Sequence, residues 1–211
     1  GGNPELEPTR GESFTAGLVY TPQAFTPIEL FATYWHVTMD NRITLLPPTL
    51  VLANESLFPE RIIRAEPTAA DLAAGLPGTI TQIDISRMNF GRLTTSGIDL
   101  GVRYEIESTL GEFAANAVAT WIGEYETVDV PATPAVDRIN LANATTGTIT
   151  RWRAVGGLDW DRGSVSATMH VRYIPSYDDT RGGVRNGRRI GAQTFVDLQA
   201  SVDVGGATVA L

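Results

Sequence analysis

The sequence predicts an all-β protein: an antiparallel up-and-down meander of about seven to eight strands that forms a segment of a transmembrane β-barrel. Three observations predict this fold. Apolar and polar residues alternate along strand-length segments, the connections are alternately short and long, and aromatic residues collect near both ends of the segments. These features are typical of a barrel in which one strand face contacts lipid and the other lines a wet lumen.

The composition argues against several classes of protein. The chain of 211 residues contains no cysteine, which excludes disulfide frameworks and thiolate metal sites. Its formal net charge of -8 argues against a nucleic-acid-binding domain. No run of about 18 apolar residues occurs, so the sequence predicts no transmembrane helix.

The clearest strand lies within residues 89–107. From Gly97 onward its residues alternate strictly between two kinds of surface. One face holds Ile98, Leu100, Val102, Tyr104 and Ile106, and the other holds Gly97, Asp99, Gly101, Arg103 and Glu105. Because successive side chains of a strand point to opposite faces, the segment has one apolar and one polar face.

The part of the chain before this strand predicts two strands and a long insertion. Residues 13–20 and 28–40 alternate in the same way and are joined by a short turn that contains proline. Residues 41–88 are rich in Pro, Ala and Glu, and within them we expect a helical turn at 68–74 and a short strand at 79–85. Insertions of this length are usually functional or disordered.

The part after this strand continues the meander. Further strands are predicted at 112–126, 148–161, 165–177 and 193–204, and ATVAL at 207–211 begins another. Tight turns are predicted at 21–27, 108–111, 161–164 and 205–206, and long loops at 41–88, 127–147 and 178–192. In an antiparallel meander this alternation places the tight turns at one end of the sheet and the long loops at the other, as in outer-membrane barrels.

Aromatic residues form two bands along the predicted strands. Tyr20, Tyr104 and Trp160 lie near the tight-turn ends, whereas Trp121, Tyr125, Trp152, Tyr173 and Tyr177 lie toward the long-loop ends. Two such bands match the aromatic girdles at the two membrane interfaces.

A soluble β-sandwich is the alternative for an alternating all-β chain. However, the apolar face is rich in Ala and Gly, which fill space poorly in a densely packed core but leave no void when they face lipid. The opposite face carries charged residues on nearly every strand, which suits a hydrated lumen. These observations favour the membrane barrel.

Several short motifs, in order along the chain, resemble those of the TonB-dependent receptors of the Gram-negative outer membrane. They are GNPELEP at 2–8, YWHV at 34–37, DNRI at 40–43, and NFG at 89–91 followed by GIDL at 97–100. Thr9 departs from the family pattern, which most often has Glu there. The resemblance covers essentially the whole chain, and it implies a barrel of about 22 strands.

By this resemblance, residues 1–211 are a partial receptor barrel domain, and the plug, the TonB box, the early strands and the last strand lie outside them. The implied function is TonB-coupled uptake of a scarce nutrient, such as a siderophore, a vitamin or an oligosaccharide. The implied partners are this ligand, the lipid and lipopolysaccharide of the outer membrane, and TonB through the N-terminal region; a monomer is expected. A small self-contained outer-membrane barrel that acts as an adhesin or structural protein is the alternative.

The sequence contains no catalytic constellation, and we expect neither an enzyme nor a cofactor. His36 and His170 have no Cys or HExxH-type partner, so no metal site is predicted. The candidate ligand-binding residues are arginines, because a guanidinium group suits carboxylates and phosphates. They are Arg151, Arg153, Arg172, Arg181, Arg185, Arg188 and Arg189. They would attract an anionic ligand or lipopolysaccharide headgroups, or, alternatively, pair with Asp and Glu of neighbouring strands and loops.

Overall fold

A computed structural model describes residues 3–23, 27–128, 133–143, 147–181 and 187–211. The chain divides into two compact units. Unit 1 comprises Gly1–Glu12, Met39–Leu93 and Thr127–Ala135, and unit 2 comprises Ser13–Thr38, Thr94–Glu126 and Val136–Leu211.

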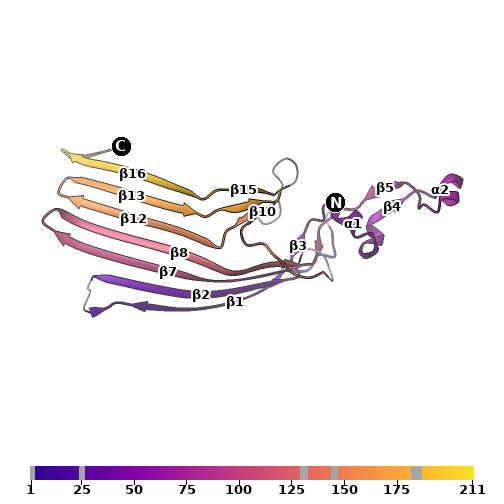
Figure 1. Cartoon of the computed structure of the whole chain (residues 1–211), viewed down its shortest axis with the longest axis horizontal. Helices are drawn as coiled ribbons and strands as arrows, with labels where there is room; N and C mark the ends of the chain where they lie inside the picture. The colour runs from indigo at the N-terminus through magenta and orange to yellow at the C-terminus, as the bar shows by residue number, and fades with distance from the viewer. Residues whose placement is uncertain (1–2, 24–26, 129–132, 144–146, 182–186) are drawn as a thin grey trace. The chain divides into compact units, whose positions relative to one another are not determined.

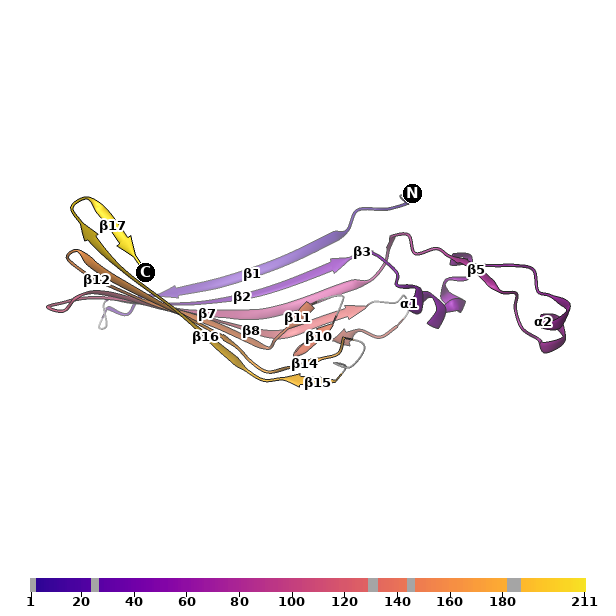
Figure 2. The same cartoon turned by 90° about the horizontal axis from the view of Figure 1, so that it is seen from above.

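The main sheet is an antiparallel meander of eight strands in chain order, as the sequence predicts (Figure 1). Its order is β1-β2-β7-β8-β12-β13-β16-β17, and the short strand β9 (Val136–Asp137) pairs with β8. The bounds are β1 Arg10–Tyr20, β2 Ile28–Asp40, β7 Arg92–Ser108, β8 Gly111–Val128, β12 Trp152–Arg162, β13 Val165–Ile174, β16 Gln193–Val204 and β17 Ala207–Ala210. Within unit 2 the strands cross at an angle, the twist expected of neighbouring strands (Figure 2).

The strand register places apolar residues of neighbouring strands opposite one another. Leu158 lies opposite Ala115 of β8 and Met169 of β13, and Met169 lies opposite Leu198 of β16. The apolar residues of these four strands therefore share one face, and the charged residues share the other. Leu198 is 74% exposed, so in unit 2 this apolar face is not the core of a sandwich.

The polar face is bonded from strand to strand by side chains. The Thr120 hydroxyl donates to Asp99 at 2.6 Å, and the Thr168 hydroxyl donates to Asp159 at 2.8 Å. Such cross-strand pairs satisfy carboxylates that the alternation places on this face.

A second, smaller sheet in unit 2 was not predicted from the sequence. It joins residues from two of the predicted long loops in the order β11-β10-β14-β15. The strands are β10 Leu141–Asn143, β11 Gly147–Ile149, β14 Tyr177–Asp179 and β15 Arg188–Ile190. β10 and β14 pair in parallel, which ties the second long loop to the third.

Unit 1 has a core of its own, formed by the predicted insertion together with Phe90. Leu46, Val51, Phe58, Ile62 and Phe90 are buried together. Its elements are β3 Ile43–Thr44, α1 Pro48–Ala53, η2 Glu55–Leu57, η3 Pro59–Arg61, β4 Ile62–Arg64, α2 Ala69–Ala74, β5 Ile80–Ile83 and β6 Met88–Asn89. The helical turn and the short strand expected within the insertion correspond to α2 and β5.

Candidate ligand-binding site

The polar face of unit 2 brings two of the predicted arginines together. Arg153 of β12 and Arg172 of β13 line a hollow of about 370 Å³ at the long-loop end of these strands. The rest of its lining is neutral: Thr148, Thr150, Ala154, Val155, Tyr173, Ile174 and Tyr177. The hollow therefore carries two positive charges and no carboxylate, in a chain whose net charge is -8.

The strand register explains why the two arginines converge. Val155 lies opposite Arg172, and Arg153 is two residues before Val155 on the same face of β12. The two arginines are thus diagonal neighbours, about 7–8 Å apart in the backbone and within reach of a shared ligand. Arg172 also stacks on the ring of Phe195, which lies opposite it on β16, with 5.0 Å between the guanidinium carbon and the ring centroid.

Neither guanidinium of this hollow is neutralised by a carboxylate of the described residues. Arg153 donates to the Thr148 carbonyl at 3.0 Å and weakly to the Thr150 hydroxyl at 3.5 Å. The Arg172 contact is the cation–π contact with Phe195. Both side chains therefore retain N–H groups and a full charge for another partner.

By contrast, the charge of Arg181 is paired with a carboxylate of the protein. Its guanidinium donates two hydrogen bonds to Asp179. Nε donates to Oδ1 at 2.8 Å, and a terminal nitrogen donates to Oδ2 at 2.7 Å. Asp179 is fully buried, and it raises the pKa of Arg181 above its ordinary value through these bonds and its charge. The pair fixes β14 within the small sheet, so Arg181 has a structural role here.

Arg151, Arg188 and Arg189 do not line this hollow. Arg189 pairs with Asp178 at 3.5 Å and donates to the Ser176 hydroxyl at 2.7 Å. Arg151 donates to the backbone carbonyls of β8 at 3.3 and 3.4 Å. Arg188 is exposed on β15, opposite Asp179 in the register. Arg185 lies outside the described residues.

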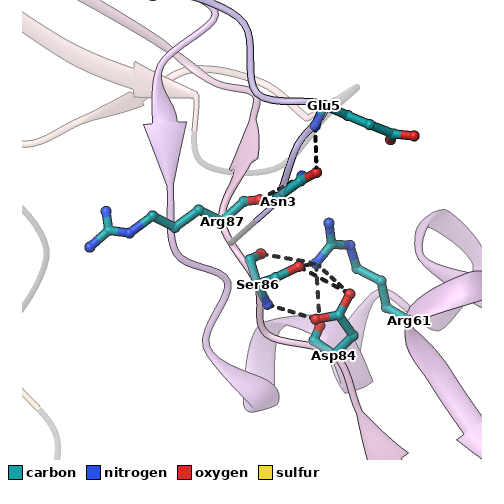
Figure 3. Close-up of polar contacts among 6 residues, drawn as sticks. All are labelled: Asn3, Glu5, Arg61, Asp84, Ser86 and Arg87. Atoms are coloured by element: carbon teal, nitrogen blue, oxygen red, sulfur yellow. Dashed lines mark hydrogen bonds and ion pairs between the residues drawn. The ribbon is translucent and has the colours of Figure 1, made fainter. Parts of the chain in front are cut away.

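Unit 1 contains a second concavity, of about 560 Å³, beside the N-terminal segment. Three segments with family-like motifs meet here through asparagine side chains. The Asn89 amide donates to the backbone carbonyls of Glu7 and Asn41, at 2.6 and 3.0 Å, and its oxygen accepts from the Glu7 N–H at 2.7 Å. Asn3 donates to the Arg87 carbonyl at 2.9 Å (Figure 3). These bonds give Asn3 and Asn89 a structural role in this chain.

One wall of this concavity is organised by a nearly buried arginine (Figure 3). Arg61 donates to the carbonyls of Asp84 and Ser86, at 3.3 and 3.0 Å. The pKa of Asp84 is held below its ordinary value of 3.8 by hydrogen bonds from the backbone N–H and the hydroxyl of Ser86, and further by the Arg61 charge. Arg61 thus serves as an internal brace for the 84–86 turn.

The histidines are not assembled into a metal site. His36 forms a hydrogen bond with Thr38 on its own strand, at 3.2 Å, and His170 lies opposite Asp197 in the register. Over the described ranges, no group of three His, Cys, Asp or Glu side chains is placed to hold a metal ion. None of the helices among these residues is long and apolar enough to cross a membrane.

Together, the meander, the exposed apolar face and the charged hollow on the opposite face define a wall segment of a β-barrel. The sequence matches the family described as "TonB dependent receptor-like, beta-barrel" over residues 1–211. The chain belongs to this family, and the resemblance seen in its motifs is confirmed.

The fold is also similar to that of a solved structure, the copper transporter OprC. The TM-score is 0.51 at 13% sequence identity, and the match covers 98% of this chain and 25% of the OprC chain. At this identity the likeness shows the fold alone, and the chain spans about a quarter of the length of that protein. A search of curated proteins finds no match.

The sequence predicted arginines as candidate ligand contacts, but it did not indicate which of the described ones are engaged by carboxylates. The alternation of β12 and β13 already places Arg153 and Arg172 on the polar face. The aromatic partner of Arg172 was missed, because Phe195 stands at a polar-face position of β16 and only the register shows that it lies opposite Arg172.

Proposed function

We propose that this chain is part of an outer-membrane receptor that takes up a scarce nutrient in a TonB-dependent manner. The observation that carries the proposal is the family match over residues 1–211, together with the antiparallel meander of the main sheet. In such a receptor the chain would supply barrel wall and part of the ligand-facing surface. The plug, the segment that contacts TonB, the early strands and the last strand would belong to the rest of the receptor.

The arginines near the long-loop end are proposed to face the ligand. Arg153 and Arg172 are the best placed, because both line one hollow and neither is neutralised by a described carboxylate. Arg181 and Arg189 are less suited, because each is engaged by an aspartate. The copper named for OprC is not carried over to this chain, since the described residues offer no metal-ligand cluster.

The experiment that tests this function is a fractionation and uptake assay with the intact receptor. The protein should sediment with the outer membrane, and its unheated form should migrate faster than its heated form in a detergent gel. Siderophores, vitamins and oligosaccharides are each supplied at a growth-limiting concentration. Cells that express the receptor should gain uptake of one of them, and deletion of TonB should abolish this gain. Uptake that persists without TonB would overturn the coupling, and a soluble protein would overturn the membrane assignment.

A further inference from the structure

We propose that the hollow formed by Arg153 and Arg172, together with the neighbouring Phe195, is a subsite for an organic anion with an apolar body, such as an aromatic carboxylate. The inference deepens the proposed function by naming a ligand class. It rests on that function only in taking the polar face as the wet side of a receptor barrel.

The first step of the argument concerns charge. Two like charges at diagonal positions of one sheet face repel each other unless an anion lies between them. Among the carboxylates of the polar face, Asp99 accepts from Thr120 and Asp159 accepts from Thr168. Asp197 is the diagonal neighbour of Arg172 on β16, but among the described residues it forms no ion pair with Arg172. An incoming carboxylate would therefore be the group that neutralises the pair, through charge-assisted hydrogen bonds.

The second step concerns the apolar part of the surface. A single row across four strands holds Val118, Val155, Arg172 and Phe195 on the otherwise polar face. Val155 is 50% exposed and Phe195 is 39% exposed, so this apolar surface is open to a ligand. Ile174 and Tyr177 extend it on the other side of the hollow. A small inorganic anion would leave this surface unused, whereas an aromatic anion would cover it.

The third step concerns size. The hollow of about 370 Å³ lies at the lower end of the range found for small-molecule pockets, roughly 300–1,000 Å³. A ring system of two fused rings with one carboxylate fits this volume. A subsite of this size would hold one end of a larger ligand or the whole of a small one.

The test measures binding of 2-naphthoate to the purified intact receptor in lipid nanodiscs, without TonB or an energy source. The neutral 2-naphthamide and the small anion acetate are compared as probes. Arg153→Gln and Arg172→Gln are compared with Arg162→Gln, a matched control at the opposite end of β12. Heat-dependent gel migration checks that each variant is folded.

We expect 2-naphthoate to bind, and each of the two test variants to weaken its binding about tenfold, since a charge-assisted hydrogen bond contributes at least this much. Arg162→Gln should bind 2-naphthoate like the wild-type receptor, and naphthamide and acetate should bind at least tenfold more weakly than naphthoate.

Equal binding of naphthamide would overturn the requirement for an anion, and equal binding of acetate would overturn the requirement for an apolar body. Unchanged binding by the two test variants, or no binding of naphthoate, would overturn the site. Because the assay needs no transport, failure of this subsite and failure of TonB-coupled uptake are distinguishable.

Discussion

At the scale of single residues, the neighbours of an arginine decide whether it can serve a ligand. The guanidinium of Arg181 donates hydrogen bonds to both carboxylate oxygens of the buried Asp179. Arg172 meets an aromatic ring instead, which attracts its charge without neutralising it. Arginine therefore serves as a structural brace just after β14, at Arg181, and as a potential ligand contact in β13, at Arg172.

The Asp179–Arg181 pair should hold the small sheet together. We expect Asp179→Asn to speed hydrogen exchange of the Thr180 amide, which donates to the Ala142 carbonyl, about tenfold or more. The reason is that an amide in place of the carboxylate turns an N–H toward the guanidinium and removes one charge-assisted bond. The measurement is mass-spectrometric hydrogen exchange on the intact receptor.

A matched control is Asp178→Asn, one residue away. The Asp178 carboxylate is 3.5 Å from Arg189 and 42% exposed, so its loss should change exchange of the Thr180 amide little. Equal effects of the two substitutions would show that Asp179 has no special role.

At the scale of elements, alternation predicted the main strands and their faces because one face differs chemically from the other along every strand. It could not predict the pairing of β10 with β14, because strands of three residues carry no usable period and their partners come from different loops. Likewise, it could not predict that Leu46 and Phe58 share a core, since their segments have no repeat. For the candidate site, the faces of Arg153 and Arg172 were predictable, whereas the hollow that they share, with its otherwise neutral lining, required the structure.

The helical turn expected at residues 68–74 is the helix α2, and its start is capped by side chains. Thr68 and Asp71 form a capping box, in which the Thr68 hydroxyl oxygen accepts from the Asp71 backbone N–H and the Asp71 carboxylate accepts from the Thr68 backbone N–H. The pKa of Asp71 is lowered from its ordinary 3.8 by hydrogen bonds from the hydroxyl and the backbone N–H of Thr68. Ionised Asp71 thus stabilises the start of this helix.

This capping box should make the start of α2 sensitive to acid. Because the pKa of Asp71 is lower in the folded chain than in the unfolded one, its stabilising effect is present above the unfolded value of about 3.9 and is lost as the pH falls through the folded value. We expect Thr68→Val to raise the pKa of Asp71 toward its ordinary value. The measurement is the titration of the Asp71 carboxyl carbon by NMR in receptor labelled with ¹³C-aspartate, assigned with Asp71→Asn. An unchanged titration midpoint in Thr68→Val would contradict the proposed cause.

The strand β7 should depend on a glycine at position 97. A Cβ on Gly97 would lie 2.5 Å from the Trp35 ring and would collide with the Trp121 backbone carbonyl, which cannot rotate away. We expect Gly97→Ala to destabilise the sheet by about 1–3 kcal/mol, the usual cost of overpacking. The measurement is the urea midpoint of heat-dependent gel migration.

Gly156→Ala on β12 is the matched control for this prediction. Its Cβ would lie 3.4 Å from the Asn116 carbonyl and 3.9 Å from the Ala117 side chain, distances that need little adjustment. We expect its urea midpoint to remain close to that of the wild type. A loss in Gly156→Ala as large as in Gly97→Ala would show that the close approach to Trp35 and Trp121 is not the cause.

At the scale of the whole molecule, the chain contains two units that are stabilised in different ways. Unit 2 has a sheet with a highly exposed apolar face, as expected where lipid takes the place of a core. Unit 1 buries Leu46, Val51 and Phe58 as a small water-soluble domain does. The long insertion therefore contributes most of a compact unit with its own core, which explains why strand periodicity does not describe it.

This difference predicts that the two units lose structure separately. Phe58 is 2% exposed at the centre of the unit 1 core, and Phe58→Ala should cost that core about 3–5 kcal/mol. We expect hydrogen exchange to accelerate at the β4 and β5 amides of unit 1, while the amides of β12 and β13 in unit 2 keep their wild-type protection. Leu72→Ala is the control within the same unit, because Leu72 is 67% exposed and its truncation should change exchange little. Faster exchange in β12 and β13 of the Phe58→Ala receptor would show instead that the insertion and the sheet unfold as one cooperative body.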